Sequence, residues 1–364
     1  MWYDTAATKI LGSQYPIMQG PFGGGLSSVE LTAAVSNLGG IGGYGVYTFE
    51  PDEIIRVNHN IRKATNKPYN INIWISDTDT MPEKLIDDRF EKAKALFRTY
   101  FDELGIGVPE KPIIQKSRYE NQVQTILDIR PPIFSFSFGI PSADILDQCR
   151  KKNIVTAGSA TTAEEAMVLE AAGVDLVIAS GFEAGGHRPS FLASAESSLV
   201  GSFVLVQQIK DRVSIPVIAA GGIASGKGIA AALALGADGV QIGTAFLACE
   251  ESAAPSFHRN LLFSDAAKHT VLSRAFTGRL GRGLANRITV ETNGRETAFL
   301  PFPSQSRFTG TLREAAIERK KWDLIFVWGG QIASLLKHRR AADLMKALIS
   351  ETNTFFAEGV KRKA

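Results

Sequence analysis

The sequence predicts an α/β protein: a (β/α)8 TIM barrel with a smaller, partly helical second domain. Over the first 250 residues, short apolar segments that favour strands alternate with amphipathic segments that favour helices. Eight apolar segments are present, and most are apolar along their whole length, which is typical of parallel strands buried on both faces. Eight such units favour a closed barrel over an open, doubly wound sheet.

The predicted elements follow one another in a regular order. A helix over 27–40 follows the first strand, with Ser27 or Ser28 as its N-cap. Pro51 suits the first turn of the next helix, which we expect to run to residue 65. Two more helices are expected over 82–104 and 118–129. The eight strands are expected at residues 15–20, 41–46, 70–75, 131–139, 153–158, 174–180, 215–220 and 238–244.

An internal similarity is the third observation that supports the barrel. The segments "EAAGVDLVIAS" and "LALGADGVQIG" share one layout: a helix end, a glycine, an aspartate and an apolar strand. Gly173 and Gly236 are expected to end the two helices, and Asp175 and Asp238 to open the two strands. The same βα unit is therefore expected twice.

The alternation of strands and helices stops near residue 250, which indicates a change of domain. We expect residues 1–250 to form the barrel domain and residues 251–320 to form the smaller domain. Residues 321–364 are expected to form C-terminal helices that pack back on the barrel, and these helices include "IFVWGGQIASLLK".

Composition limits the possible partners and the compartment. The 364 residues carry a net charge of +3, which does not indicate binding to nucleic acid or to an anionic membrane surface. No run of about eighteen apolar residues predicts a membrane span, and the N-terminus has no signal-peptide pattern. Cys149 and Cys249 are far apart and fit neither a zinc site nor a disulfide framework, so no metal site is expected. We expect a cytoplasmic protein, and its oligomeric state is not predicted.

Glycine and polar residues recur where the predicted strands end. In a (β/α)8 barrel, the active site lies at the carboxyl ends of the strands. We therefore expect a binding site there, although the same glycines would also suit tight turns. The candidate residues are Gly20, Pro21 and Phe22 after the first strand, Asn72 in the third, Ser180 and Gly181 at the sixth, Gly221 and Gly222 after the seventh, and Gly243 and Thr244 after the eighth.

The loops after the seventh and eighth strands predict a phosphate site. Gly221 and Gly222 precede a helix that is expected to begin near Ser225, and Gly243 and Thr244 lead into another. Free N–H groups at helix starts bind phosphate, and glycines let the backbone approach it closely. Neither a dinucleotide-binding nor a P-loop motif is present. A single terminal phosphate suits a mononucleotide cofactor such as FMN, or a phosphorylated substrate.

The segment "SGFEAGGHRPSF" carries the candidate catalytic residue, His187. It lies on a glycine-containing loop directly after a buried strand, and the near-neutral pKa of histidine suits proton transfer. Arg188, Arg279 and Arg282 could stabilise an anion or form salt bridges between domains. We expect structural or surface roles for the other histidines, which are His59, His258, His269 and His338.

Five segments together resemble the nitronate monooxygenase family, formerly called 2-nitropropane dioxygenases. They are "PIMQGPFGGG", "NINIW", "GFEAGGHR", "PVIAAGGIASGKGIAAALALGADGVQIGTAFL" and "RAFTGRLGRGLANR". The resemblance extends over roughly residues 10–340. FMN-dependent enoyl-acyl-carrier-protein reductases share the barrel and many of these motifs.

The resemblance implies a TIM barrel that holds FMN without a covalent bond, with His187 as the catalytic base. Two positions differ from the usual family pattern: Phe22 stands where Met is frequent, and Ser180 where Gln is frequent. The residues that the resemblance places around the flavin are Asn72, Ser180, Gly185, Gly222, Gln241, Ile242, Gly243 and Thr244.

Three functions are compatible with this sequence. The first is an FMN-dependent nitronate monooxygenase, which oxidises alkyl nitronates, with their parent nitroalkanes as possible further substrates, using O2 to give carbonyl compounds and nitrite. The second is an FMN-dependent reductase that uses NAD(P)H to reduce enoyl thioesters. The third is a flavin-binding barrel without catalytic activity.

Overall fold

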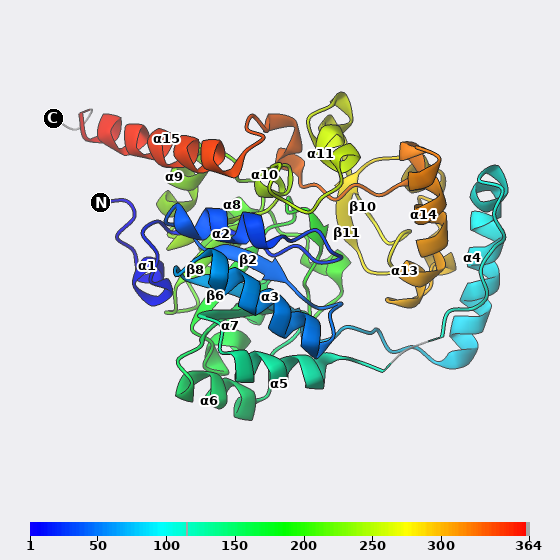
Figure 1. Ribbon diagram of the computed structural model, residues 1–364, viewed down its shortest axis with the longest axis horizontal. Helices are drawn as coiled ribbons and strands as arrows, with labels where there is room; N and C mark the ends of the chain where they lie inside the picture. The colour runs from blue at the N-terminus through cyan, green and yellow to red at the C-terminus, as the bar shows by residue number, and fades with distance from the viewer. Residues whose placement is uncertain (114–115, 362–364) are drawn as a thin grey trace.

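A computed structural model, which describes residues 1–113 and 116–361, contains the predicted barrel (Figure 1). Its eight parallel strands are β1 (Ile17–Gln19), β2 (Gly42–Gly45), β3 (Tyr69–Trp74), β4 (Ile133–Ser137), β5 (Val155–Ala160), β6 (Leu176–Ser180), β8 (Val217–Ala220) and β9 (Gly239–Ile242). They pair in the order β1-β9-β8-β6-β5-β4-β3-β2. Between β1 and β2, the amide of Gln19 donates to the carbonyl of Ile41 at 2.8 Å. This bond nearly closes the sheet and confirms the predicted fold class.

Helices surround the barrel between successive strands. Ser28, one of the two predicted N-caps, accepts a hydrogen bond from the amide of Leu31 at 2.9 Å, and Pro51 opens its helix as expected. These helices are α2 (Val29–Asn37), α3 (Pro51–Ala64), α5 (Tyr119–Ile129), α6 (Ala143–Lys151), α7 (Ala163–Ala171), α8 (Ser202–Lys210), α9 (Gly226–Ala234) and the single turn α10 (Thr244–Leu247).

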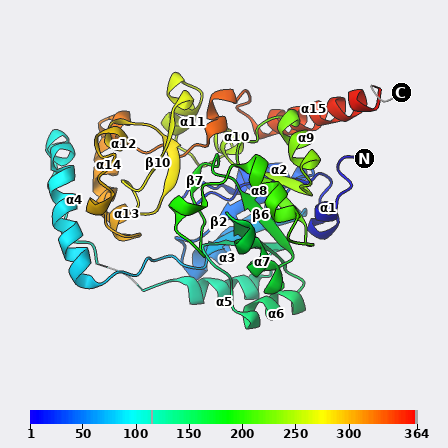
Figure 2. The same ribbon diagram turned by 180° about the vertical axis from the view of Figure 1, so that it is seen from behind.

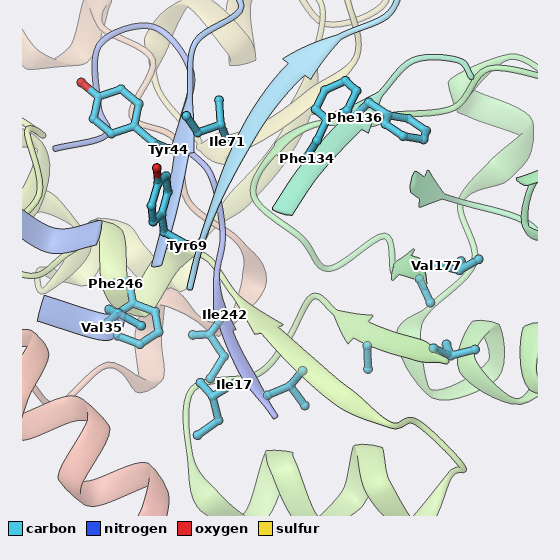
Figure 3. Close-up of a cluster of buried hydrophobic side chains, with 14 of the residues drawn as sticks. Ile17, Val35, Tyr44, Tyr69, Ile71, Phe134, Phe136, Val177, Ile242 and Phe246 are labelled. Carbon is cyan, nitrogen blue, oxygen red and sulfur yellow. The ribbon is translucent and has the colours of Figure 1, made fainter. Parts of the chain in front are cut away.

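The strands are apolar on both faces because each face packs against a different layer. Val177 and Val217 belong to the cluster between the strands and the outer helices, part of which is shown in Figure 3. Their neighbours Ile178 and Ile218 point into the barrel, where they join Leu11 of the short helix α1 (Ala6–Leu11). Apolar side chains of the described residues therefore fill the amino end of the barrel.

The internal similarity has a structural basis. The backbone amide of Thr156 donates to Asp175 at 2.7 Å, and that of Val217 donates to Asp238 at 2.9 Å. Each aspartate thus ties the start of its own strand to the start of the preceding strand in the sheet. Gly173 adopts the positive φ of +85° that the predicted helix end requires.

A second sheet and a group of short helices cover the carboxyl end of the barrel. The sheet is antiparallel, in the order β10-β11-β7. Its strands are β10 (Thr270–Ser273), β11 (Gly281–Leu284) and β7 (Gly186–His187), and its helices are α11 (Ser256–Leu262), α12 (Arg287–Glu291), α13 (Ser304–Phe308) and α14 (Gly310–Glu318). Since β7 comes from the loop after β6, this sheet joins the barrel to the covering segment, which we call the cap.

Helix α4 (Glu83–Glu103) packs against the cap, although it lies far from it in the sequence. Figures 1 and 2 show α4 beside α13 and α14, at the opposite end of the molecule from α15 (Ala341–Lys361). Phe97 and Phe101 of α4 contribute to the same buried cluster as Phe308. The sequence-based boundaries placed this helix within residues 1–250, because apolar spacing identifies a buried helix face but not what it packs against.

The segment after the cap differs from the prediction. We expected residues 325–337 to be helical, but only Gln331–Leu335 form a 3-10 helix. Gly329 and Gly330 disfavour a helix, and the amide of Gly330 instead donates to Thr244 Oγ1 at 2.9 Å. Helix α15 then packs on the barrel, where Leu344 is buried. Among residues 1–113 and 116–361, none of the helices combines the length and the apolarity needed to cross a membrane.

We predict that Gly42→Ala destabilises the barrel by about 3 kcal/mol, because the added methyl group overpacks a closed interface. A Cβ at this position would overlap the carbonyl oxygen of Thr32 in α2. Urea unfolding measures the change. Gly107→Ala is the matched control, since a Cβ there meets no atom within 4 Å. Equal stability of the two variants would contradict the close approach of α2 to β2.

Candidate active site

A cavity of about 350 Å³ lies where the carboxyl end of the barrel meets the cap. It brings together most of the predicted site residues, namely Gly20, Pro21, Phe22, Asn72, Ser180, Gly185, His187, Gly221, Gly222, Gln241, Gly243 and Thr244. Gly181 and Ile242 do not line it. Gly181 packs against Glu183 and Ser202, and the Ile242 side chain is buried in the layer between the barrel and its helices.

Polar side chains and glycine backbone line the cavity at the carboxyl ends of the strands. Asn72 donates from Nδ2 to Ser135 Oγ at 2.9 Å. Gln241 Oε1 is buried and has no hydrogen-bond partner among the described residues. A Cβ at Gly243 would meet no protein atom within 4 Å, and Gly222 has a φ of +72°. An unpaired amide oxygen beside open glycine backbone fits a polar ligand that lies against the strand ends.

The expected phosphate site is smaller than the sequence indicated. At the start of α9, the amide of Gly226 already donates to Glu351 of α15 at 2.8 Å. The Ser225 side chain accepts the amide of Gly228, so that helix start has partners within the protein. The backbone of Gly222, Gly243 and Thr244 lines the cavity and could hold a phosphate.

His187 lies on β7 with aromatic rings on several sides. The centroid of its ring is 5.3 Å from that of Trp74, 4.8 Å from Trp328 and 6.0 Å from Phe302. Its Nε2 lies 2.8 Å from Thr277 Oγ1. Its Nδ1 has no hydrogen-bond partner among the described residues, and His187 lines the cavity.

The surroundings of His187 favour its neutral form. Burial, with a smaller effect of the positive charges of Arg279 and Arg274, lowers the pKa of His187 to about 3. The imidazole is therefore neutral at physiological pH and has a free nitrogen that can accept a proton.

The three candidate arginines all have structural partners. Arg188 donates to the carbonyl of Gly181 at 2.7 Å and to two further carbonyls. Arg279 forms a salt bridge of 2.7 Å with Asp79, and Arg282 donates to the carbonyl of Phe182 at 3.0 Å. None of the three lines the cavity. Among the described residues, only Arg279 of the three forms the salt bridge that was expected, whereas Arg188 and Arg282 bond to backbone carbonyls.

Several cavity residues were not found by sequence reasoning. Tyr47 stacks on Trp74 with 3.7 Å between ring centroids. Thr277 and Arg313 reach the cavity from the cap, and Trp328 reaches it from the segment that follows the cap. Trp74 is the last residue of the quoted segment "NINIW", so its place at a strand end could have identified it. Tyr47 directly follows the predicted strand at 41–46, so its position at a strand end could have identified it as well. The other three lie outside the predicted strand ends, and only the packing of later segments over the barrel brings them to the site.

The barrel, the glycine-lined cavity and the neutral histidine above it define an enzyme of the (β/α)8-barrel class. The chain belongs to the nitronate monooxygenase family, whose family model matches residues 4–351. It is 34% identical over 356 residues to a probable nitronate monooxygenase from Staphylococcus haemolyticus, covering 97% of this chain and 98% of that protein. Against one from Staphylococcus aureus, it is 35% identical over 354 residues, with the same coverage.

Solved structures show the same similarity. The nitroalkane oxidase from Streptomyces ansochromogenes superposes with a TM-score of 0.87 at 32% identity, covering 99% of this chain and 100% of that one. FabK from Thermotoga maritima superposes with a TM-score of 0.74 at 26% identity, covering 99% of both chains. These comparisons confirm the resemblance to the nitronate monooxygenase family.

We predict that the free energy of unfolding depends on pH through His258. This buried residue bonds through Nε2 to the carbonyl of Trp328 at 2.9 Å, and burial lowers its pKa to about 4. Between pH 7 and 5, the unfolded chain takes up a proton at this histidine before the folded chain does. The stability that depends on neutral His258 is therefore lost as the pH falls, by about 2 kcal/mol at pH 5.

We expect His258→Gln to lose about 2 kcal/mol less than the wild type between pH 7 and pH 5, as measured by urea unfolding at both values. His59→Gln, at an exposed position of α3, should lose as much as the wild type. A wild-type-like loss in His258→Gln would show that this histidine does not titrate below its ordinary range.

Proposed function

We propose that this protein is an FMN-dependent nitronate monooxygenase that oxidises alkyl nitronates with O2 to carbonyl compounds and nitrite. One observation carries the proposal: His187, whose Nδ1 has no hydrogen-bond partner among the described residues, lines the same cavity as the glycine-rich end of the barrel. Membership of the nitronate monooxygenase family supports it.

The cavity fits FMN through features of its own backbone and side chains. We propose that the backbone of Gly222, Gly243 and Thr244 holds the phosphate, and that Asn72 and Gln241 face the flavin ring. The unpaired Gln241 Oε1 would then have a partner. FMN held there would supply the redox chemistry, which is the oxidation of the nitronate and the reduction of O2.

His187 gives the protein a way to act on neutral nitroalkanes as well. The α-proton of a nitroalkane passes to the imidazole nitrogen that faces the cavity, and the electron pair of the C–H bond stays on the substrate as a nitronate anion. Burial alone disfavours the imidazolium, but the anion forms beside it and offsets part of that effect. A nitronate supplied as such does not need this step.

We predict that Gly243→Ala weakens the binding of FMN and leaves the stability of the fold unchanged. Since the added methyl meets no protein atom, the variant should fold with an unchanged melting temperature. The methyl would instead keep a phosphate from approaching the backbone. We expect the Kd for FMN, measured by quenching of flavin fluorescence, to rise about tenfold or more. Gly107→Ala is the control. Unchanged FMN affinity in Gly243→Ala would place the phosphate elsewhere.

His187→Asn tests the proposed reaction. With a neutral nitroalkane such as nitroethane, we expect oxygen uptake to fall about 100-fold or more, because the base is lost. With preformed propionate 3-nitronate, the variant should keep most of its activity. His59→Asn, at an exposed position of α3, should behave as the wild type with both substrates. Equal losses on the two substrates in His187→Asn would rule out proton abstraction as its role.

Oxygen uptake, together with the visible absorption of the bound flavin, distinguishes the alternative functions. A yellow protein that ignores nitronates but is bleached by NADH or NADPH without oxygen would be an enoyl-thioester reductase. A protein that binds FMN tightly and turns over neither substrate would be a non-catalytic flavin-binding barrel. A protein that stays colourless and takes up no added FMN would contradict the proposed flavin site itself.

A further inference from the structure

We propose that Thr277 is a positioning residue that fixes the proton of His187 on Nε2 and so leaves Nδ1 as the base that faces the cavity. The catalytic meaning of this inference rests on the proposed function, whereas the hydrogen-bond arrangement does not. It also assigns a role in the site to the segment "RAFTGRLGRG", which is part of the last of the five segments that carry the family resemblance.

The inference starts from a chain of two hydrogen bonds. Thr277 Oγ1 lies 2.8 Å from His187 Nε2 and 3.2 Å from the carbonyl oxygen of Arg279. A threonine hydroxyl has one proton to donate and lone pairs that accept. A carbonyl oxygen can only accept, so the bond to Arg279 uses the hydroxyl proton of Thr277. The hydroxyl oxygen must then accept from His187, which places the imidazole proton on Nε2.

The opposite arrangement satisfies fewer groups. If Thr277 donated its proton to His187 Nε2, the Arg279 carbonyl would lose the only side-chain donor it has among the described residues. The proton of His187 would then lie on Nδ1, where no described protein group accepts it. The first arrangement makes two hydrogen bonds and the second makes one, which favours the Nε2–H tautomer.

Neighbouring contacts keep both partners in place. Trp74 and Trp328 flank the His187 ring, so a ring flip that exchanges its two nitrogens would disturb their packing. Thr277 lies in a tight turn in which the amide of Gly278 donates to the carbonyl of Arg274 at 2.8 Å. Gly278 has a φ of +89°, and a Cβ there would overlap the carbonyl oxygen of Leu300. The turn therefore tolerates only glycine at this position, and its shape presents the Thr277 hydroxyl to His187.

The proton balance of the reaction follows from this arrangement. The α-proton of the nitroalkane moves to Nδ1, and the C–H electron pair becomes part of the nitronate. Nε2 keeps its proton and its hydrogen bond to Thr277 throughout. The imidazolium that forms is thus bonded to a neutral hydroxyl rather than to a carboxylate, so Thr277 sets the orientation of the base without adding charge to the cavity.

Nitrogen NMR of the full-length protein with FMN added, labelled with 15N at histidine, tests the tautomer directly. The His187 signals are assigned by their loss in His187→Asn. We expect a protonated, pyrrole-like Nε2 and an unprotonated, pyridine-like Nδ1 at neutral pH. A protonated Nδ1 in the wild type would overturn the inference whether or not the protein is active, and this measurement needs no Thr277 variant.

Substitutions at Thr277 provide the second test. Thr277→Val removes the acceptor and keeps the shape, so we expect the ratio of the two tautomers to shift by about tenfold towards Nδ1–H. Thr277→Ser keeps the hydroxyl and should restore the wild-type spectrum. Thr354→Val, at an exposed position of α15, is the matched control. An unchanged His187 spectrum in folded Thr277→Val would overturn the inference.

The activity of the same variants links the tautomer to the reaction. We expect Thr277→Val to lower kcat on nitroethane about tenfold while its kcat on propionate 3-nitronate stays near that of the wild type, with Thr277→Ser close to wild type on both. An equal loss on both substrates would contradict positioning of the base. If the wild type shows the expected tautomer but oxidises no nitro compound, the proposed function fails and the assignment of the tautomer stands.

Discussion

The pairing of β7 with β11 is the constraint on which the site depends. β7 consists of only two residues, and its register places His187 opposite Gly281. A side chain at Gly281 would lie 2.8 Å from the Trp328 ring, so glycine is needed for the two strands to meet beneath that ring. The pairing acts together with the hydrogen bonds from Arg188 to the carbonyls of Ser180 and Gly181, which hold the start of the same loop. The pairing makes the loop after β6 part of the wall of the cavity.

Burial and hydrogen bonding act together on His187, which the pairing of β7 with β11 places at the cavity. The aromatic wall keeps the imidazole neutral, while the cavity leaves one of its nitrogens open. The positive charge of Arg279, which lies near His187, is paired with Asp79. Its guanidinium lies over the rings of Phe138 and Phe302. This arginine joins the loop after β3 to the cap, so it closes the site without entering it. A neutral base that can take up a proton suits a substrate that becomes an anion during the reaction.

The cap also explains why one of the apolar clusters is separate from those of the barrel. The barrel cluster contains residues from the strands and their covering helices, whereas the cap cluster combines α4 with segments about 200 residues later in the chain. Contacts between segments early and late in the chain thus hold the cap over the barrel. The cavity lies at the junction of the cap and the barrel. Residues such as Thr277 and Trp328 belong to the site only because of this arrangement.

The sequence by itself determined the barrel, the strand ends and the candidate base. Continuous apolarity identified the parallel strands, and parallel strands place their carboxyl ends together, which is why Asn72, Gly222 and Gly243 could be grouped from their positions in the chain alone. Only the tertiary structure decided the partner of α4, the extended course of residues 325–330 and the contribution of Thr277. Local patterns record whether a residue is buried or turns the chain, but which distant segment it meets depends on packing between whole elements.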